Sequence, residues 1–496
     1  MKTIAIFACL AATVPLTAQQ VPPTEDSRIQ TITESVSPTR LESDVTSLVS
    51  FGTRNTLSDT LSETRGIGAA RRWIKAEFDR ISAACGNCLE VFYVGEIYPA
   101  SRRLPDTVNV VNVVAIQRGT TDPNRMVIMC GDIDSRGGSG VNAIDSAPGA
   151  NDNASGMAGT IEVARLLTQH RFNGSIVYMG LSAEEQGLMG GQTMARYAQE
   201  HGWNIQAVLN NDMIGNIEGI NGIIDNTHAR VLSDGTPPTE TEEARRARRF
   251  TGGEVDGISR QVARYVDRMA DMYLPTLDVM MIYRLDRFGR GGHHRPFADL
   301  GFPAVRIMEA NENYNRQHQD IRFEDGIAYG DVLEGVDFEY ATKLTALNAA
   351  TLASLAWAPG PPANVRLTGA NRPAAKLSWE APADAANVAG YRAHWRLTDS
   401  PTWDFSRWVG DVNEFTFDGL IIDNYFFGLS AVSADGHESV VVFPASGPPP
   451  PPPPTKQPLK TFGLPDISIA FHHYTHPLNH WVIFCRGRVP GISRHE

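Results

Sequence analysis

The chain has 496 residues, of which 42% are hydrophobic and 20% are charged, a composition that excludes global disorder. At roughly 150 residues per domain, this length predicts about three domains. The 44 basic and 56 acidic side chains give a formal net charge of −12. Because proteins that bind nucleic acids or anionic membrane surfaces are usually basic, we expect neither as a partner.

The N-terminus has the pattern of a secretory signal. A lysine precedes an apolar run at residues 4–16, and small residues follow it up to Ala18. We expect residues 1–18 to be a signal peptide and the mature protein to be periplasmic or secreted. No later stretch has the ~20 uninterrupted apolar residues that a membrane span needs, so none is expected.

Residues 25–355 alternate between helical and strand patterns, which favours an α/β domain. Short apolar runs predict strands, and apolar residues at helical spacing predict helices. In chain order the predicted elements are a strand at 125–130, a helix at 154–170, a strand at 176–181, a helix at 189–201, and strands at 207–209 and 303–308.

A second region, residues 360–446, follows a stiff proline-containing linker and alternates as short strands do. It resembles a fibronectin type III domain, with Trp379 and Tyr425 at positions typical of that domain's core and tyrosine corner. We therefore expect a small all-β sandwich, and such a module would bind a polymer or a surface, or act as a spacer. Residues 447–496 contain an unbroken proline run and are predicted to form a linker and a disordered tail.

Acidic residues follow three of the predicted strands. Asp132 and Asp134 follow the first strand, Glu184 and Glu185 the second, and Asp212 the third. Ligands of open α/β sheets bind beyond the carboxyl ends of the strands, so these side chains should meet at one edge. Crowded carboxylates repel one another and raise one another's pKa, and a bound divalent cation relieves this. The pattern predicts a metal site.

Two loops add candidate ligands. The segment 148–156, Pro-Gly-Ala-Asn-Asp-Asn-Ala-Ser-Gly, places Asp152 directly before a helix. Taken alone, Asp152 is equally typical of a helix N-cap. The glycine-flanked segment 291–297 offers imidazole ligands, among them His294.

Together these segments resemble the co-catalytic zinc exopeptidases of metallopeptidase family twenty-eight, which contains bacterial leucyl aminopeptidases and glutamate carboxypeptidases. The resemblance runs through most of residues 40–350 and implies a mixed, mostly parallel sheet flanked by helices. Five motifs occur in the family's order: Gly131-Asp-Ile-Asp-Ser135, Ala147-Pro-Gly-Ala-Asn-Asp-Asn153, Ser182-Ala-Glu-Glu-Gln-Gly-Leu188, Asn211-Asp-Met213, and His294 followed by Gly301-Phe-Pro303. Residues 314–318 resemble a family segment near the site, but no role is assigned to them.

The resemblance implies two divalent ions, expected to be zinc. Asp152 would bridge them, Glu185 and His294 would complete one site, and Asp132 and Asp212 would complete the other. Glu184 would be the general base that takes a proton from the attacking water.

One position departs from the family pattern, because Asp132 stands where the family has histidine. Asp132 could bind the metal directly, it could be too short and leave the second site weak or empty, or Arg136 could neutralise the added charge. We expect direct ligation. Since oxygen-only sites suit harder ions, this site should bind zinc more weakly and accept Mn²⁺ or Mg²⁺.

The resemblance implies a secreted, metal-dependent aminopeptidase that hydrolyses peptide or protein substrates from their N-termini. A carboxypeptidase of the same fold would need a basic pocket for the terminal carboxylate. A glutaminyl cyclase of this fold uses a single zinc ion. Because position 132 lacks the histidine of the two-metal site, this alternative stays open. The β-rich domain and Asp132 also leave open a non-catalytic binding protein.

Overall fold

The computed structural model describes residues 20–444. The predicted signal peptide, residues 1–18, and the predicted linker and tail, residues 447–496, lie outside this part of the chain. Within it, no helix is both long enough and apolar enough to cross a membrane.

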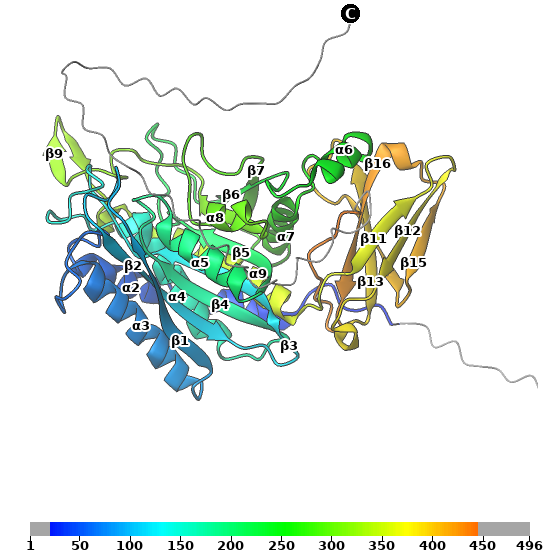
Figure 1. Cartoon of the computed structure of the whole chain (residues 1–496), viewed down its shortest axis with the longest axis horizontal. Helices are drawn as coiled ribbons and strands as arrows, with labels where there is room; N and C mark the ends of the chain where they lie inside the picture. Colours follow the sequence, from blue (N-terminus) through cyan, green and yellow to red (C-terminus); the bar gives the residue numbers. More distant parts are fainter. Residues whose placement is uncertain (1–19, 445–496) are drawn as a thin grey trace, which may run out of the picture. The chain divides into compact units, whose positions relative to one another are not determined.

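The main feature is an eight-stranded mixed sheet in the order β1-β2-β4-β3-β5-β8-β6-β7 (Figure 1). The strands are β1 (Leu89–Tyr98), β2 (Val108–Gln117), β3 (Asp122–Asp132), β4 (Gly174–Leu181), β5 (Asn204–Asn211), β6 (His228–Ser233), β7 (Asp278–Ile282) and β8 (Ala304–Glu309). A separate hairpin is formed by β9 (Arg322–Glu324) and β10 (Ile327–Tyr329).

The centre of this sheet is parallel. Strands β4, β3, β5 and β8 are neighbours and run in the same direction, whereas β2 pairs with β4 and β6 pairs with β8 in the antiparallel sense. Strands β4 and β8 are buried at every position, as expected for strands covered on both faces. The carboxyl ends of the four central strands therefore lie at one edge, and the predicted α/β fold class is confirmed.

Helices cover both faces of the sheet (Figure 1). Helices α3, α4, α7 and α9 contribute to the apolar cluster on one face, and α5 and α8 to the cluster on the other. The helices are α1 (Ser27–Glu34), α2 (Pro38–Ser50), α3 (Gly66–Ala84), α4 (Gly156–Leu167), α5 (Met189–Glu200), α6 (Glu242–Thr251), α7 (Ile258–Tyr273), α8 (His294–Asp299) and α9 (Phe338–Trp357).

Helix α4 is buried on nearly every side, because β3 contacts one side of it and α9 another. The sequence predicts this helix from residue 154, but the α-helix begins at Gly156. Residues 150–155 form a wider, irregular turn instead, with non-helical backbone at Asp152 and Asn153. This turn carries Asp152, one of the predicted metal ligands.

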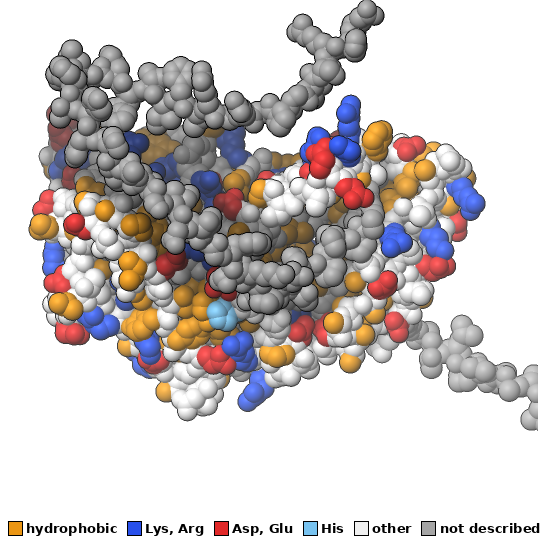
Figure 2. Space-filling model, in the orientation of Figure 1, with side chains coloured by type: hydrophobic (Ala, Val, Ile, Leu, Met, Phe, Trp, Pro, Cys, Tyr) orange, Lys and Arg blue, Asp and Glu red, His pale blue; other side chains and the backbone are white. Residues whose placement is uncertain are grey.

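Helix α6 differs from the others because none of its residues is buried. Glu242 pairs with Arg245 and Arg246 on its surface. In Figure 2 acidic and basic side chains lie next to each other at the place of this helix. Glu242 thus compensates two of the arginines of this helix.

Two three-stranded antiparallel sheets complete the described chain, in the orders β11-β12-β15 and β14-β13-β16. Their shared apolar cluster includes Trp379, Tyr391 and Phe427. The fibronectin type III assignment of this region stays a prediction. The strands are β11 (Ala363–Thr368), β12 (Ala374–Glu380), β13 (Gly390–Leu397), β14 (Phe405–Gly410), β15 (Glu414–Asp418) and β16 (Tyr425–Val432).

A buried ion pair joins this region to the loop before α7. Arg396 of β13 donates two hydrogen bonds to the Asp256 carboxylate, at 2.7 and 2.8 Å, and both side chains are fully buried. Arg264 of α7 binds the same carboxylate at 2.8 Å. Two guanidinium groups thus compensate one carboxylate in the contact.

Candidate metal centre

The predicted acidic residues lie at the carboxyl edge of the parallel strands. Asp132 is the last residue of β3, and Asp212 directly follows β5. Glu184 and Glu185 lie in the turn that follows β4. Since β4, β3 and β5 are adjacent and parallel, the sheet itself brings these carboxylates together.

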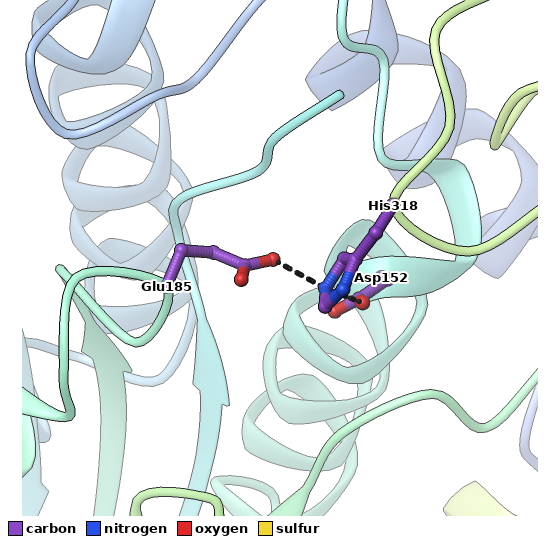
Figure 3. Close-up of side chains that lie close together, drawn as sticks. All are labelled: Asp152, Glu185 and His318. Atoms are coloured by element: carbon purple, nitrogen blue, oxygen red, sulfur yellow. Dashed lines mark ion pairs between the residues drawn. The ribbon is translucent and has the colours of Figure 1, made fainter. Parts of the chain in front are cut away.

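One group of side chains can hold a metal ion. Asp152, Glu185 and His318 offer ligand atoms that all lie within 4.8 Å of one another, and within residues 20–444 this is the single group of three or more such side chains. The His318 Nε2 atom lies 3.0 Å from Asp152 Oδ2 and 2.9 Å from Glu185 Oε1. Figure 3 shows the His318 ring reaching the two carboxylates, which approach it from different elements.

The charges of this group suit a cation. Burial lowers the pKa of His318, but the Glu185 and Asp152 carboxylates outweigh this and raise it to about 10. Burial raises the pKa of Asp152, but the hydrogen bond and the charge of His318 outweigh it and hold the pKa below its ordinary value. The two carboxylates thus attract positive charge at the point where a metal ion would be coordinated. Carboxylate oxygens and imidazole nitrogens are both among the ligands that zinc binds in proteins.

His318 takes the place that the sequence analysis assigns to His294. His294 is fully buried, and its Nε2–H donates a hydrogen bond to the Leu285 carbonyl oxygen at 2.7 Å. Burial lowers the pKa of His294 to about 4, so the ring is neutral. His294 starts helix α8 and turns toward residues 285 and 286, so it supports the loop before α8 and is not in the metal-binding group.

The structure therefore corrects the histidine of this site. His318 lies beyond the end of β8, in a loop with no regular secondary structure. The one signal for it in the sequence is the resemblance of residues 314–318 to a family segment. His294, in contrast, belongs to a glycine-rich segment that is conspicuous in the sequence. The role of His294 in the structure is to support the loop before α8.

The turn that carries Asp152 is held by its backbone. The Asp331 carboxylate accepts hydrogen bonds from the backbone N–H groups of Asn151 at 2.9 Å and Asp152 at 2.7 Å. Gly156 brings the turn close to the end of β5, because a Cβ at this position would lie only 2.3 Å from the Asn211 carbonyl oxygen. A cis peptide bond joins Asp152 to Asn153. The position of Asp152 thus depends on residues distant in sequence.

Asp134 positions the Glu184-Glu185 turn. Its carboxylate accepts the backbone N–H of Glu184 at 3.1 Å and that of Glu185 at 3.2 Å. Burial, followed by the charge of Glu185, raises the pKa of Asp134 to about 7. Asp134 thus anchors the two glutamates.

Arg136 lies beside the metal-binding group and does not act on Asp132. Its Nη1 atom is 3.7 Å from Glu185 Oε2, and its other hydrogen bonds go to nearby backbone carbonyls. Arg136 therefore does not supply the neutralising charge that the sequence analysis keeps as one outcome for Asp132.

The second expected ion would need Asp132 and Asp212, and both are bound to protein groups. The Arg306 Nη2 atom lies 2.9 Å from Asp212 Oδ2, and Arg306 is fully buried. The Asn153 Nδ2 group donates to Asp132 Oδ2 at 2.9 Å. Burial raises the pKa of Asp132 well above its ordinary value, and the charge of Asp212 adds to this effect. Within the described residues Asp132 Oδ1 is buried without a hydrogen-bond partner, so the feature of this donor set that does not fit a second metal ion is the guanidinium of Arg306 at Asp212.

A cavity of about 560 Å³ opens onto the metal-binding group. Glu184 lines it together with Asp152, Glu185, Asp212 and His318. Five arginines also line it, namely Arg103, Arg136, Arg287, Arg290 and Arg295. A larger cavity, of about 1290 Å³, lies beside the disulfide between Cys85 and Cys88 and contains none of these acidic residues. The smaller cavity is therefore the candidate substrate site.

Comparisons with known proteins identify relatives of this chain. Residues 112–325 match peptidase family M28. A probable zinc metalloprotease of Leptosphaeria maculans is 39% identical over 428 residues, covering 86% of this chain and 99% of the relative. A probable zinc metalloprotease of Pyricularia oryzae is also 39% identical, covering 85% of each chain.

Solved structures with a similar fold include the LapA aminopeptidase of Legionella pneumophila, with a TM-score of 0.49 and 19% identity, covering 69% of this chain and 78% of LapA. A leucine aminopeptidase precursor of Bacteroides thetaiotaomicron has a TM-score of 0.46 and 15% identity, covering 67% of this chain and 99% of that protein. The family match and the near full-length fungal relatives show the relationship at the level of sequence. The chain therefore belongs to peptidase family M28.

Proposed function

We propose that the protein is a zinc-dependent aminopeptidase that removes N-terminal residues from peptides. The observation that supports this proposal most directly is the Asp152, Glu185 and His318 group, which lines a cavity together with Glu184. When bound by these residues, zinc would polarise the scissile carbonyl and lower the pKa of a water molecule to about 7.

Glu184 is suited to act as the general base. Burial, followed by the charges of Glu185 and Asp212, raises its pKa well above the ordinary value. A raised pKa suits a carboxylate that takes a proton from the attacking water and then gives it to the leaving amine. The backbone bond to Asp134 holds Glu184 in the turn beside the metal ligand Glu185. The two neighbouring glutamates would thus divide metal binding and proton transfer between them.

The carboxylates of the cavity favour a positively charged substrate group. Glu184 and Asp212 line the cavity beside the metal ligands, and an α-ammonium group would be attracted to them. This is the reason to place the free N-terminus of the substrate at the metal centre.

The arginines of the cavity favour a second candidate, a carboxypeptidase. Within residues 20–444, neither Arg103 nor Arg295 forms an ion pair with an acidic side chain, although both line the cavity. An arginine without an acidic partner is suited to bind a carboxylate, such as the C-terminus of a peptide.

A single peptide, prepared in four forms, distinguishes an aminopeptidase from a carboxypeptidase. The peptide carries a free or acetylated N-terminus and a free or amidated C-terminus, and mass spectrometry identifies the released residue. Loss of cleavage on acetylation, with no effect of amidation, is expected for the aminopeptidase. The reverse result would establish the carboxypeptidase, and no cleavage of any form by the zinc-loaded protein would support a binding protein.

The variant Glu184→Gln tests the assigned base. Glutamine has nearly the same shape but cannot accept the proton, so we expect kcat to fall by about 10²–10⁴ while zinc content stays the same. Zinc analysis of the variant is the control that separates a lost base from a lost metal. An unchanged kcat would remove the role of Glu184.

Two further proposals rest on the sequence. The predicted signal peptide of residues 1–18 is the reason to propose that the enzyme is secreted. The β-rich region after residue 360 is proposed to contact a polymer or a surface. The sequence also predicts a second ion at Asp132, Asp152 and Asp212. This site would bind zinc weakly, or would accept Mn²⁺ or Mg²⁺. The side chains around these residues decide whether an ion can bind there.

A further inference from the structure

We infer that Arg306 takes the place of the second metal ion, so that the centre holds one zinc ion and one built-in guanidinium. This inference rests on the proposed zinc site at Asp152, Glu185 and His318. It concerns the charge that compensates the remaining carboxylates, Asp132 and Asp212.

Arg306 is committed to Asp212. Its Nη2 atom lies 2.9 Å from Asp212 Oδ2 and also donates to the Asp212 carbonyl oxygen at 3.3 Å. The other side of the guanidinium donates to the Gly291 carbonyl oxygen at 2.8 Å and lies 3.3 Å from Asp286 Oδ2. These bonds fix the guanidinium between Asp212 and the loop before α8.

The position of Arg306 follows from the sheet. Arg306 lies in β8, opposite Asn210 of β5, and it is fully buried. Its side chain cannot reach solvent without a rearrangement of the central strands. Guanidinium groups keep their charge at all accessible pH values.

A dication on Asp212 would be held next to this fixed positive charge. Zinc lies about 2 Å from a carboxylate oxygen. Arg306 Nη2 is 2.9 Å from Asp212 Oδ2, so zinc on that oxygen would lie within about 5 Å of the guanidinium. Two like charges at this distance in a buried site repel strongly. The guanidinium already gives Asp212 the positive neighbour that a metal ion would provide.

Asp132 is oriented by Asn153. The Asn153 Oδ1 atom accepts the backbone N–H groups of Gly156 at 3.1 Å and Met213 at 3.2 Å. The opposite end of the amide must then be the NH₂ group, which donates to Asp132 Oδ2 and to the Asn211 carbonyl oxygen. A hydrogen-bond donor thus occupies one oxygen of Asp132.

The other oxygen of Asp132 faces His293. His293 Nδ1 accepts the backbone N–H of Gly191 at 3.1 Å, so the proton of the neutral ring is on Nε2. This Nε2 atom lies 3.5 Å from Asp132 Oδ1, and both side chains are buried. In the part of the chain that the structure describes, Asp132 Oδ1 and His293 Nε2 are both buried without a hydrogen-bond partner, so only Oδ2 of Asp132 is committed to a protein group. The obstacle to a second ion is therefore the pairing of Arg306 with Asp212.

The first test is the metal content of the purified wild-type protein, measured by elemental analysis after dialysis against metal-free buffer and again after dialysis with excess Zn²⁺ or Mn²⁺. We expect one zinc per chain and no second ion in either condition. Two zinc ions, or one zinc with one manganese, would overturn the inference and support the sequence prediction for Asp132. No bound metal would refute the proposed zinc site itself, so the two failures are distinguishable.

The second test restores the expected site. Asp132→His alone should stay at one zinc because Arg306 remains, whereas Asp132→His with Arg306→Met should bind two. The matched control combines Asp132→His with Arg230→Met. Arg230 is a partly buried arginine that pairs with Glu312 and not with Asp212. The control should stay at one zinc. Two zinc ions in the Asp132→His single variant, or one in a folded Arg306→Met double variant, would show that Arg306 is not the obstacle.

Discussion

The histidine at the metal centre can be tested by replacing His318 and His294 separately with asparagine. His318 is one of three side chains in the metal-binding group, and its Nε2 atom lies about equally close to both carboxylates, at 3.0 and 2.9 Å. Loss of a residue that only supports a ligand already lowers metal affinity by about 10–100-fold. Loss of the ligand itself should cost at least about 100-fold, or about 2.7 kcal/mol of binding free energy.

His294→Asn should have the opposite pattern. The zinc affinity should stay the same, because His294 is outside the metal-binding group. The free energy of unfolding should fall by about 2–4 kcal/mol, since a fully buried ring is lost and the Leu285 carbonyl loses its donor.

The assay for both variants is a competition titration with a chromophoric zinc chelator, together with denaturant unfolding of the zinc-free proteins. Unfolding of the zinc-free state separates a lost ligand from a lost fold. The assignment would be refuted if His294→Asn lost zinc while remaining folded and His318→Asn kept wild-type affinity.

Two further predictions concern stability. Burial and the charge of Asp271 raise the pKa of Asp267 to about 7, so the folded state binds the proton more tightly than the unfolded chain and stability is lost as the pH rises from about 4 to 7. Asp267→Asn should therefore raise the free energy of unfolding by about 1–2 kcal/mol at pH 8, after allowance for solvent screening. Urea titrations should show that this gain shrinks toward pH 4. An equal gain at both pH values would contradict the assigned pKa shift. Arg396→Met removes one partner of the buried Asp256 carboxylate and should lower the free energy of unfolding by about 3–5 kcal/mol, measured by the same titrations. A smaller loss would mean that the remaining arginine alone compensates Asp256.

The sequence by itself determined the α/β class, because strand and helix periodicities are local and the observed strands β3, β4, β5 and β8 contain the predicted segments. It also placed carboxylates at one edge of the sheet, since side chains that follow adjacent parallel strands must meet there. Glu185 is one of these carboxylates, whereas Asp152 lies in the turn before α4, and its predicted role came from the family resemblance.

Only the tertiary structure decided which histidine joins Asp152 and Glu185, and which cation pairs with Asp212. His318 arrives from an irregular loop, whose path depends on contacts with distant residues and not on its own periodicity. Arg306 looks in the sequence like an ordinary residue of a strand, and its proximity to Asp212 arises from the pairing of β8 with β5. Charge compensation in a buried centre depends on which strands are neighbours, and strand order is a non-local property of the fold.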